Sequence, residues 1–166
     1  PLDAEKAKLH IEKAGMKGAT VEIITTPNIE GSVEGGQLIQ QVSRNTGLNI
    51  KVRRVPYDGY WSTHWTKDPI GYGSINPRPT LDMLFSQFYL SNAGNNESGW
   101  KNQQFDQLVV AARGERAQGK RKQMYGDMQT LIYDHCGTII PTFISALDGC
   151  SNKVGGVEAW PSGMML

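Results

Sequence analysis

The chain has 166 residues, of which 39% are hydrophobic, and its 17 basic and 16 acidic residues give a formal net charge of +1. This length suits one well-buried domain and not two ordinary ones, and the sequence lacks the concentrated basic residues that nucleic-acid binding usually leaves. The sequence contains no run of eighteen apolar residues, the length needed to span a membrane. Its start, at Pro1 and Leu2, has no signal-peptide pattern. We therefore expect a fragment or a processed product.

The first third of the chain predicts a βαβ unit. Asp3 is a good N-cap for a helix that runs to about residue 14, and alternating apolar residues over 19–25 predict a strand. Residues 35–46 then carry a helical stripe, and alternation over 48–52 predicts a second strand. Because a helix connects them, the two strands are expected to be parallel, with a right-handed crossover.

The remaining predicted elements are mostly helices. An aromatic helix over 57–67 is followed by a third strand over 70–74 and a short buried helix over 81–88. The next helix is capped by Asn102 and carries an apolar stripe of Phe105, Leu108, Val109 and Ala112. A helix over 120–135, a last strand over 138–144 and an irregular tail from residue 152 complete the chain. Together they predict an α/β fold with a mostly parallel sheet flanked by helices, in a single domain over residues 1–166.

Familiar catalytic spacings are absent: the chain has no GxSxG, no HExxH and no phosphate-binding loop. Its three histidines fall on three separate predicted helices, and its two cysteines, Cys136 and Cys150, lack the spacing of a zinc site. The sequence therefore predicts a protein that is not an enzyme and that holds no metal and no cofactor.

Aromatic residues near the ends of predicted strands are the main candidates for a binding surface. Tyr72 and Trp100 lie in or beside loops, and ligands of open α/β sheets bind outside the carboxyl ends of strands. Packing in the core is the alternative for both, and it is favoured for Trp61 and Trp65, which are four residues apart on one helix. Arg78 stands between two prolines, which would pre-organise its guanidinium for an anion or a carbonyl group, although a plain surface arginine is the alternative.

Several short motifs, taken in order, resemble the C-terminal lobe of the peptide/nickel class of extracytoplasmic solute-binding proteins of ABC transporters. The resemblance covers nearly the whole chain, and the order and spacing of the motifs carry it. They are LDAEKA at 2–7, GYG at 71–73, PTLDMLF at 79–85, NESGWKNQQFD at 96–106, AAR at 111–113, KR at 120–121, Tyr125 with MQ at 128–129, and GTIIP at 137–141.

Members of this class are longer and hold a ligand between two lobes, so the resemblance implies that this chain is one lobe and that the N-terminal lobe is missing. It also implies a small-molecule or peptide ligand, ABC permease transmembrane subunits as partners, and a periplasmic or other extracytoplasmic location. In the peptide binders an aspartate after the Gly-aromatic strand holds the amine of the ligand. The best register places Ile75 there, between Ser74 and Asn76, so this anchor is absent unless Asp82 or an acid on the missing lobe replaces it.

The resemblance suggests a ligand-binding set of Tyr72, Ser74, Ile75, Asn76, Arg78 and Trp100. An exported protein would also favour a disulfide between Cys136 and Cys150, with two unpaired thiols as the alternative. Two other functions stay open at this point. A ligand-sensing or interaction domain outside transport would show a flat apolar patch, and a hydrolase would need His64 or His135 beside a serine or cysteine.

Overall fold

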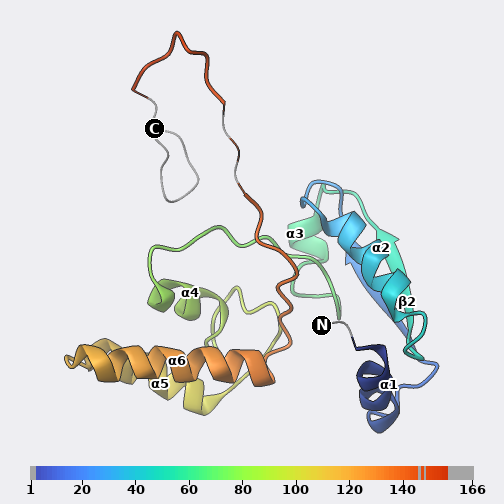
Figure 1. Ribbon diagram of the computed structural model, residues 1–166, viewed down its shortest axis with the longest axis horizontal. Helices are drawn as coiled ribbons and strands as arrows, with labels where there is room; N and C mark the ends of the chain where they lie inside the picture. The colour runs from blue at the N-terminus through green and yellow to red at the C-terminus, as the bar shows by residue number, and fades with distance from the viewer. Residues whose placement is uncertain (1–2, 146, 148, 157–166) are drawn as a thin grey trace. The chain divides into compact units, whose positions relative to one another are not determined.

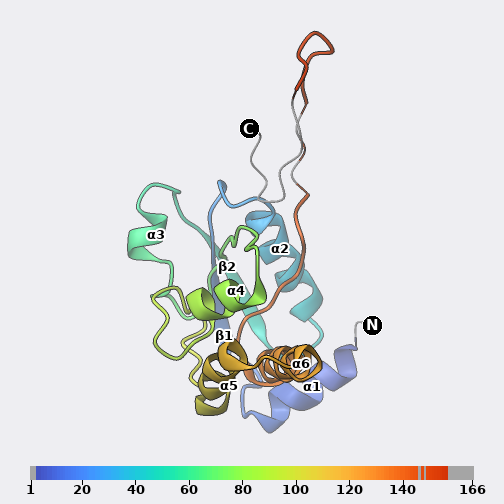
Figure 2. The ribbon, with the colours of Figure 1, turned by 90° about the vertical axis from the view of Figure 1, so that its left-hand side faces the viewer.

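The computed structural model describes residues 3–145, 147 and 149–156. Its elements, labelled in Figure 1 and, for β1, in Figure 2, are α1 (Ala4–Lys13), β1 (Thr20–Thr25), α2 (Ser32–Ser43), β2 (Asn49–Arg54), α3 (Tyr60–Thr63), α4 (Leu81–Phe88), α5 (Gln103–Gly114) and α6 (Gln118–His135). The chain divides into two compact units, one up to Ser74 and one from Ile75 onwards. Each unit has its own hydrophobic core, and the single domain over residues 1–166 stays a prediction.

The βαβ unit predicted from the sequence is confirmed in the first unit. β1 and β2 pair in parallel, with Thr20 opposite Asn49 and Thr25 opposite Arg54. The connecting helix α2 lies along the two strands (Figure 1) and packs closely against them at Gly36. A Cβ atom there would lie 2.8 Å from Cγ2 of Thr25, so this position requires glycine for the helix to pack on the sheet.

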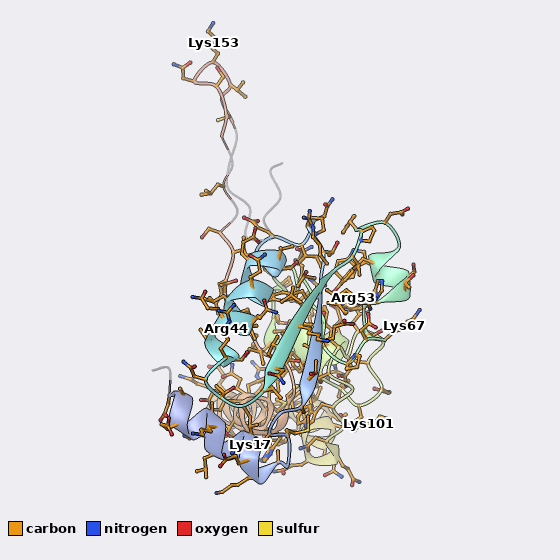
Figure 3. All side chains as sticks on the ribbon, turned by 90° about the vertical axis from the view of Figure 1, so that its right-hand side faces the viewer. Lys17, Arg44, Arg53, Lys67, Lys101 and Lys153 are labelled. Carbon is orange, nitrogen blue, oxygen red and sulfur yellow. The ribbon has the colours of Figure 1, made fainter. Side chains whose placement is uncertain are left out.

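The core of the first unit lies between β1 and the segments that follow β2. It consists of Ile24, Ile29, Val55 and Tyr60, with Trp65 and Tyr72 packed against it. The exposed edge strand β2 carries Lys51, Arg53 and Arg54, and Arg53 (labelled in Figure 3) pairs with Glu22 on β1 at 3.0 Å. Exposed pairs of this kind contribute little stability, but charges on an edge strand discourage pairing with other chains.

Two predicted elements of the first unit are much shorter than expected. The third strand over 70–74 is reduced to a single bridge between Ile24 and Gly71, because the carbonyl oxygen of Tyr72 accepts a hydrogen bond from the Tyr60 hydroxyl at 2.6 Å. The aromatic helix over 57–67 is reduced to α3, four residues long. Gly59 before it and Thr66 after it both have left-handed backbone conformations, which interrupt a helix.

The second unit is built from α4, α5 and α6, and α5 and α6 lie side by side in both ribbon views (Figures 1 and 2). Its core contains Phe85, Phe88, Tyr89, Phe105, Val109, Ala112 and Met128. The predicted stripe of the Phe105 helix is confirmed, since Phe105, Val109 and Ala112 are fully buried. The predicted cap is confirmed as well, because Oδ1 of Asn102 accepts the N–H of Phe105 at 3.0 Å.

The last predicted strand, over 138–144, is wrong as an element of this chain. The described residues there have no strand assignment, and Ile139 and Phe143 are exposed. A strand needs a neighbour for its N–H and C=O groups, and no neighbouring strand is found for this segment within residues 3–145, 147 and 149–156. The tail from residue 152 has only a turn and irregular structure up to residue 156, and the rest of it lies outside the described residues.

Candidate functional site

The six predicted site residues lie on the segment 71–80 and on the loop before α5. Tyr72 and Ser74 belong to the first unit, and the other four belong to the second. In the first unit Tyr72 is half-buried, and its ring packs against α2. A Cβ atom on Gly35 would lie 2.3 Å from the Tyr72 hydroxyl, so the ring fits only over a glycine. Burial raises the pKa of Tyr72, whose hydroxyl has no hydrogen-bond partner among the described residues. Tyr72 is therefore largely a packing residue, with only part of its ring accessible.

Ser74 and Asn76 are both exposed, each within its own unit. Ile75 is half-buried and packs against the core of the second unit, where an apolar side chain fits and a carboxylate would lose its hydration. The apolar surroundings of position 75 therefore suit isoleucine better than the aspartate of the peptide binders.

Arg78 makes several contacts within the second unit. Its Nε donates to Oε1 of Gln87 at 2.5 Å, and its Nη1 donates to the carbonyl oxygens of Asn76 at 2.7 Å and Pro77 at 3.3 Å. The guanidinium carbon lies 5.4 Å from the centre of the Phe88 ring, a cation–π distance. No carboxylate lies within 4.0 Å of the guanidinium in the described part of the chain, so these neighbours orient its positive charge without neutralising it.

Trp100 is half-buried and packs on the second core, with its ring 5.2 Å from that of Phe105 in an edge-on arrangement. The side-chain amide of Asn96 donates to the carbonyl oxygens of Leu90 at 3.2 Å and Trp100 at 2.7 Å. The hydroxyl of Ser98 accepts the N–H of Trp100 at 3.2 Å. The loop before α5 is therefore ordered by internal hydrogen bonds, although its sequence shows no helical or strand periodicity.

Position 75 also lines a shallow depression that the sequence did not predict. Its other lining residues are Phe88, Tyr89, Asn95, Glu97 and Thr138. Tyr89 is buried, and burial, together with nearby Cys136 and Glu97, raises its pKa. Glu97 is the only acid in the loop 91–101, but no sequence pattern connects it with the other lining residues.

Asp82, named as a possible substitute anchor for an amine, has another role. Its Oδ1 accepts from Nε of Arg113 at 2.8 Å and from the hydroxyl of Tyr125 at 3.5 Å. Nη2 of Arg113 also donates to the hydroxyl of Ser86 at 2.5 Å. This network joins α4, α5 and α6, so Asp82 holds the helices together and its charge is already paired.

The end of β1 has buried hydroxyl groups that the sequence analysis also missed. The Ser32 hydroxyl donates to the carbonyl oxygen of Thr26 at 2.6 Å and accepts the N–H of Thr26 at 3.1 Å, which closes the turn into α2. The side-chain hydroxyls of Thr25 and Thr26 have no partner among the described residues, and both residues are fully buried. They are not accessible to a solute in this structure.

The predicted disulfide is not formed. Both cysteines are free thiols; Cys136 ends α6 with its sulfur 3.3 Å from the Ser98 hydroxyl, whereas Cys150 is exposed. The two cysteines flank residues 138–144, which have no strand assignment in the structure. In the described part of the chain no group of three metal-ligating side chains comes together, and no helix is long and apolar enough to cross a membrane.

His64 pairs with an acid in this structure. Nδ1 of His64 lies 2.6 Å from Oδ2 of Asp68, which is four residues further along the chain. Within the described residues neither His64 nor His135 has a hydrogen bond to a serine or a cysteine side chain. In the second unit, Arg78 is hydrogen-bonded to Gln87, and Trp100 lies on a separate loop held by Asn96 and Ser98.

Comparison with known proteins gives the context of this fold. No model of a known protein family matches the chain. The chain is 23% identical over 175 residues to the dipeptide-binding protein of Escherichia coli K12, an alignment that covers 97% of the chain and 32% of that protein. Its fold superposes with a TM-score of 0.68 on the periplasmic binding protein DppA of Helicobacter pylori in complex with the peptide STSA, at 22% identity. That match covers 79% of the chain and 27% of DppA.

The chain is similar to one part of an ABC-transporter solute-binding protein. A third relative, the binding protein MoaA of A. tumefaciens R10 in complex with mannopinic acid, agrees at 25% identity and a TM-score of 0.66, covering 78% of the chain and 28% of MoaA. The α/β periplasmic-binding-protein fold predicted from the motifs is therefore confirmed. The relatives are named as binding proteins and not as enzymes, and the chain spans a third of their length or less.

Proposed function

We propose that the chain is one ligand-binding lobe of the extracytoplasmic receptor of an ABC importer. The receptor would capture a small solute between two lobes and deliver it to the transmembrane permease. The observation that carries this proposal is the agreement of sequence and fold: similarity to a dipeptide-binding protein extends over almost the whole chain, and the same chain superposes on solute-binding proteins. The permease, the second lobe and an extracytoplasmic location follow from that similarity as parts of the proposal.

The proposed binding residues are Tyr72, Ser74, Ile75, Asn76, Arg78 and Trp100. Arg78 has the clearest role, because all its described partners are neutral and leave its positive charge available. Its described hydrogen bonds use Nε and Nη1 but not Nη2, so two of its five N–H donors have no described acceptor. An anion could bind Nη2 without disturbing the others, and a bidentate contact would require Gln87 to move away from Nε.

The solute is therefore proposed to carry a carboxylate, a phosphate or a hydroxyl-rich group, and not to be recognised through a free amine. Ile75 offers no charge to an ammonium group, and the charge of Asp82 is already paired with Arg113. A buried ammonium without a partner would cost several kcal/mol, whereas an anion would gain a charge-assisted hydrogen bond from Arg78. Opine-like and sugar-like acids fit this description, and so do peptides bound through their carboxylate.

A titration panel tests the class of solute. The complete protein that carries this chain would be titrated by calorimetry with dialanine, N-acetyl-dialanine and mannopinic acid. We expect mannopinic acid to bind and acetylation of dialanine to change its affinity by less than about twofold. Tight binding of dialanine that acetylation abolishes would contradict the proposed absence of an amine anchor, while leaving the receptor function intact.

The role of Arg78 is tested by substitution in the complete protein. Arg78→Ala should weaken binding of mannopinic acid at least tenfold, about 1.4 kcal/mol, because the oriented cation is lost. Arg116→Ala, which removes another exposed arginine of the same unit, is the control and should leave the affinity unchanged. Equal affinities of the two variants would show that Arg78 is an ordinary surface residue.

A further inference from the structure

Residues 138–147, which follow α6, have the composition of a buried strand, but their described large apolar side chains are exposed to solvent. We call this stretch the apolar segment. No charged residue occurs from position 136 to position 147, and threonine, isoleucine and phenylalanine, which favour strands, make up most of it. Yet Ile139 is 81% exposed, Phe143 91% and Leu147 92%, and Ile140 and Ile144 are exposed as well.

The beginning of the apolar segment is nevertheless fixed. The N–H of Cys136 donates to the carbonyl oxygen of Ile132 at 2.9 Å, and the Cys136 sulfur contacts the hydroxyls of Ser98 at 3.3 Å and Thr138 at 3.5 Å. A Cβ atom on Gly137 would lie 3.6 Å from that of Ser98. High exposure of the large apolar side chains begins at Ile139, directly after this anchored stretch. The segment therefore leaves the second unit from a defined point.

The exposed strand β2 carries charges that protect its edge, whereas the apolar segment carries none. β2 carries Lys51, Arg53 and Arg54, and such charges on an edge strand oppose pairing with another strand. The apolar segment has no such residue and presents side chains on both faces of the strand it would form. Contiguous exposed apolar surface of this kind marks a contact surface in soluble proteins.

We propose that the apolar segment is a β-strand that pairs with a sheet edge in the part of the same protein that lies outside this chain. The chain spans only 32% of the dipeptide-binding protein and 27% of DppA, so the proteins it resembles have ample additional structure that could supply the edge. Within the described residues the only paired strands are β1 and β2. Backbone pairing would satisfy the N–H and C=O groups of the segment, and burial of Ile139 and Phe143 would stabilise it.

Pro141 determines which side of the strand can form the complete set of hydrogen bonds. In a strand the N–H and C=O of one residue point to the same side, and successive residues alternate between sides. Proline has no N–H, so the side shared by Ile139, Pro141 and Phe143 has a gap. The side shared by Ile140, Thr142 and Ile144 has none, and the sheet edge is assigned to that side.

Amide hydrogen exchange, resolved to single residues, tests this strand. In the complete protein the amides of Ile140, Thr142 and Ile144 should exchange at least a hundredfold more slowly than in the 166-residue chain alone. Rapid exchange in both proteins, or slow exchange limited to Ile139 and Phe143, would overturn the proposal. Protection in the chain alone that grows with its concentration would also overturn it, because the partner would then be a second copy.

Two proline substitutions in the complete protein sharpen the test. Thr142→Pro removes an N–H from the assigned side and should abolish the protection of Ile140 and Ile144. Ser145→Pro places proline on the side that Pro141 already interrupts, so Ile140 and Ile144 should stay protected. Loss of amide protection at Ile140 and Ile144 in both variants, or in neither, would contradict the assigned side. If Thr142→Pro fails to fold, the comparison of the unsubstituted complete protein with the unsubstituted chain still tests the strand.

Discussion

Replacing Phe105 with alanine is expected to lower the free energy of unfolding by about 3–5 kcal/mol, the cost of truncating a buried aromatic side chain. Phe105 is fully buried and packs edge-on against Phe85 at 5.4 Å and Trp100 at 5.2 Å. Its loss would leave a cavity between α4, α5 and the loop that carries Trp100. Urea unfolding followed by tryptophan fluorescence and circular dichroism measures the change.

Two adjacent valines of α5 provide a matched comparison. Val109 is fully buried, whereas Val110 is 67% exposed. Val109→Ala should cost about 1.5–3 kcal/mol, since it removes two buried methyl groups and leaves a small cavity, and Val110→Ala should change stability by less than about 0.5 kcal/mol. Similar costs for the two substitutions, or a cost below about 1 kcal/mol for Phe105→Ala, would contradict the assigned face of α5.

Local patterns predicted those parts of the fold whose structure is determined by neighbouring residues. Alternation in β1 and β2 and the helical stripe of α5 are repeated signals, and the caps Asp3 and Asn102 form the hydrogen bonds that their types favour. The strands over 70–74 and 138–144 failed because a strand depends on a partner far along the chain. The aromatic helix over 57–67 failed at Gly59 and Thr66, whose left-handed conformations the apolar pattern does not reveal.

The candidate site was predictable in part. Two flanking prolines predicted a restrained Arg78, but its contacts with Gln87 and Phe88 depend on how α4 packs. Trp100 was expected on a loop, yet its ring also belongs to the edge of the second core. The depression beside Ile75 was missed because Tyr89, Glu97 and Thr138 come from three separate stretches, and no local spacing connects them.

The central claim is that this chain supplies one side of a binding site that another lobe completes. Small-solute sites bury most of the surface of their ligand, so half of a site should leave much of the ligand hydrated and lose most of the affinity. Calorimetric titration of mannopinic acid, dialanine and N-acetyl-dialanine into the complete protein and into the 166-residue chain measures this directly. We expect any probe that binds the complete protein to bind the chain at least a hundredfold more weakly, about 2.7 kcal/mol. Equal dissociation constants for the two proteins would contradict the account.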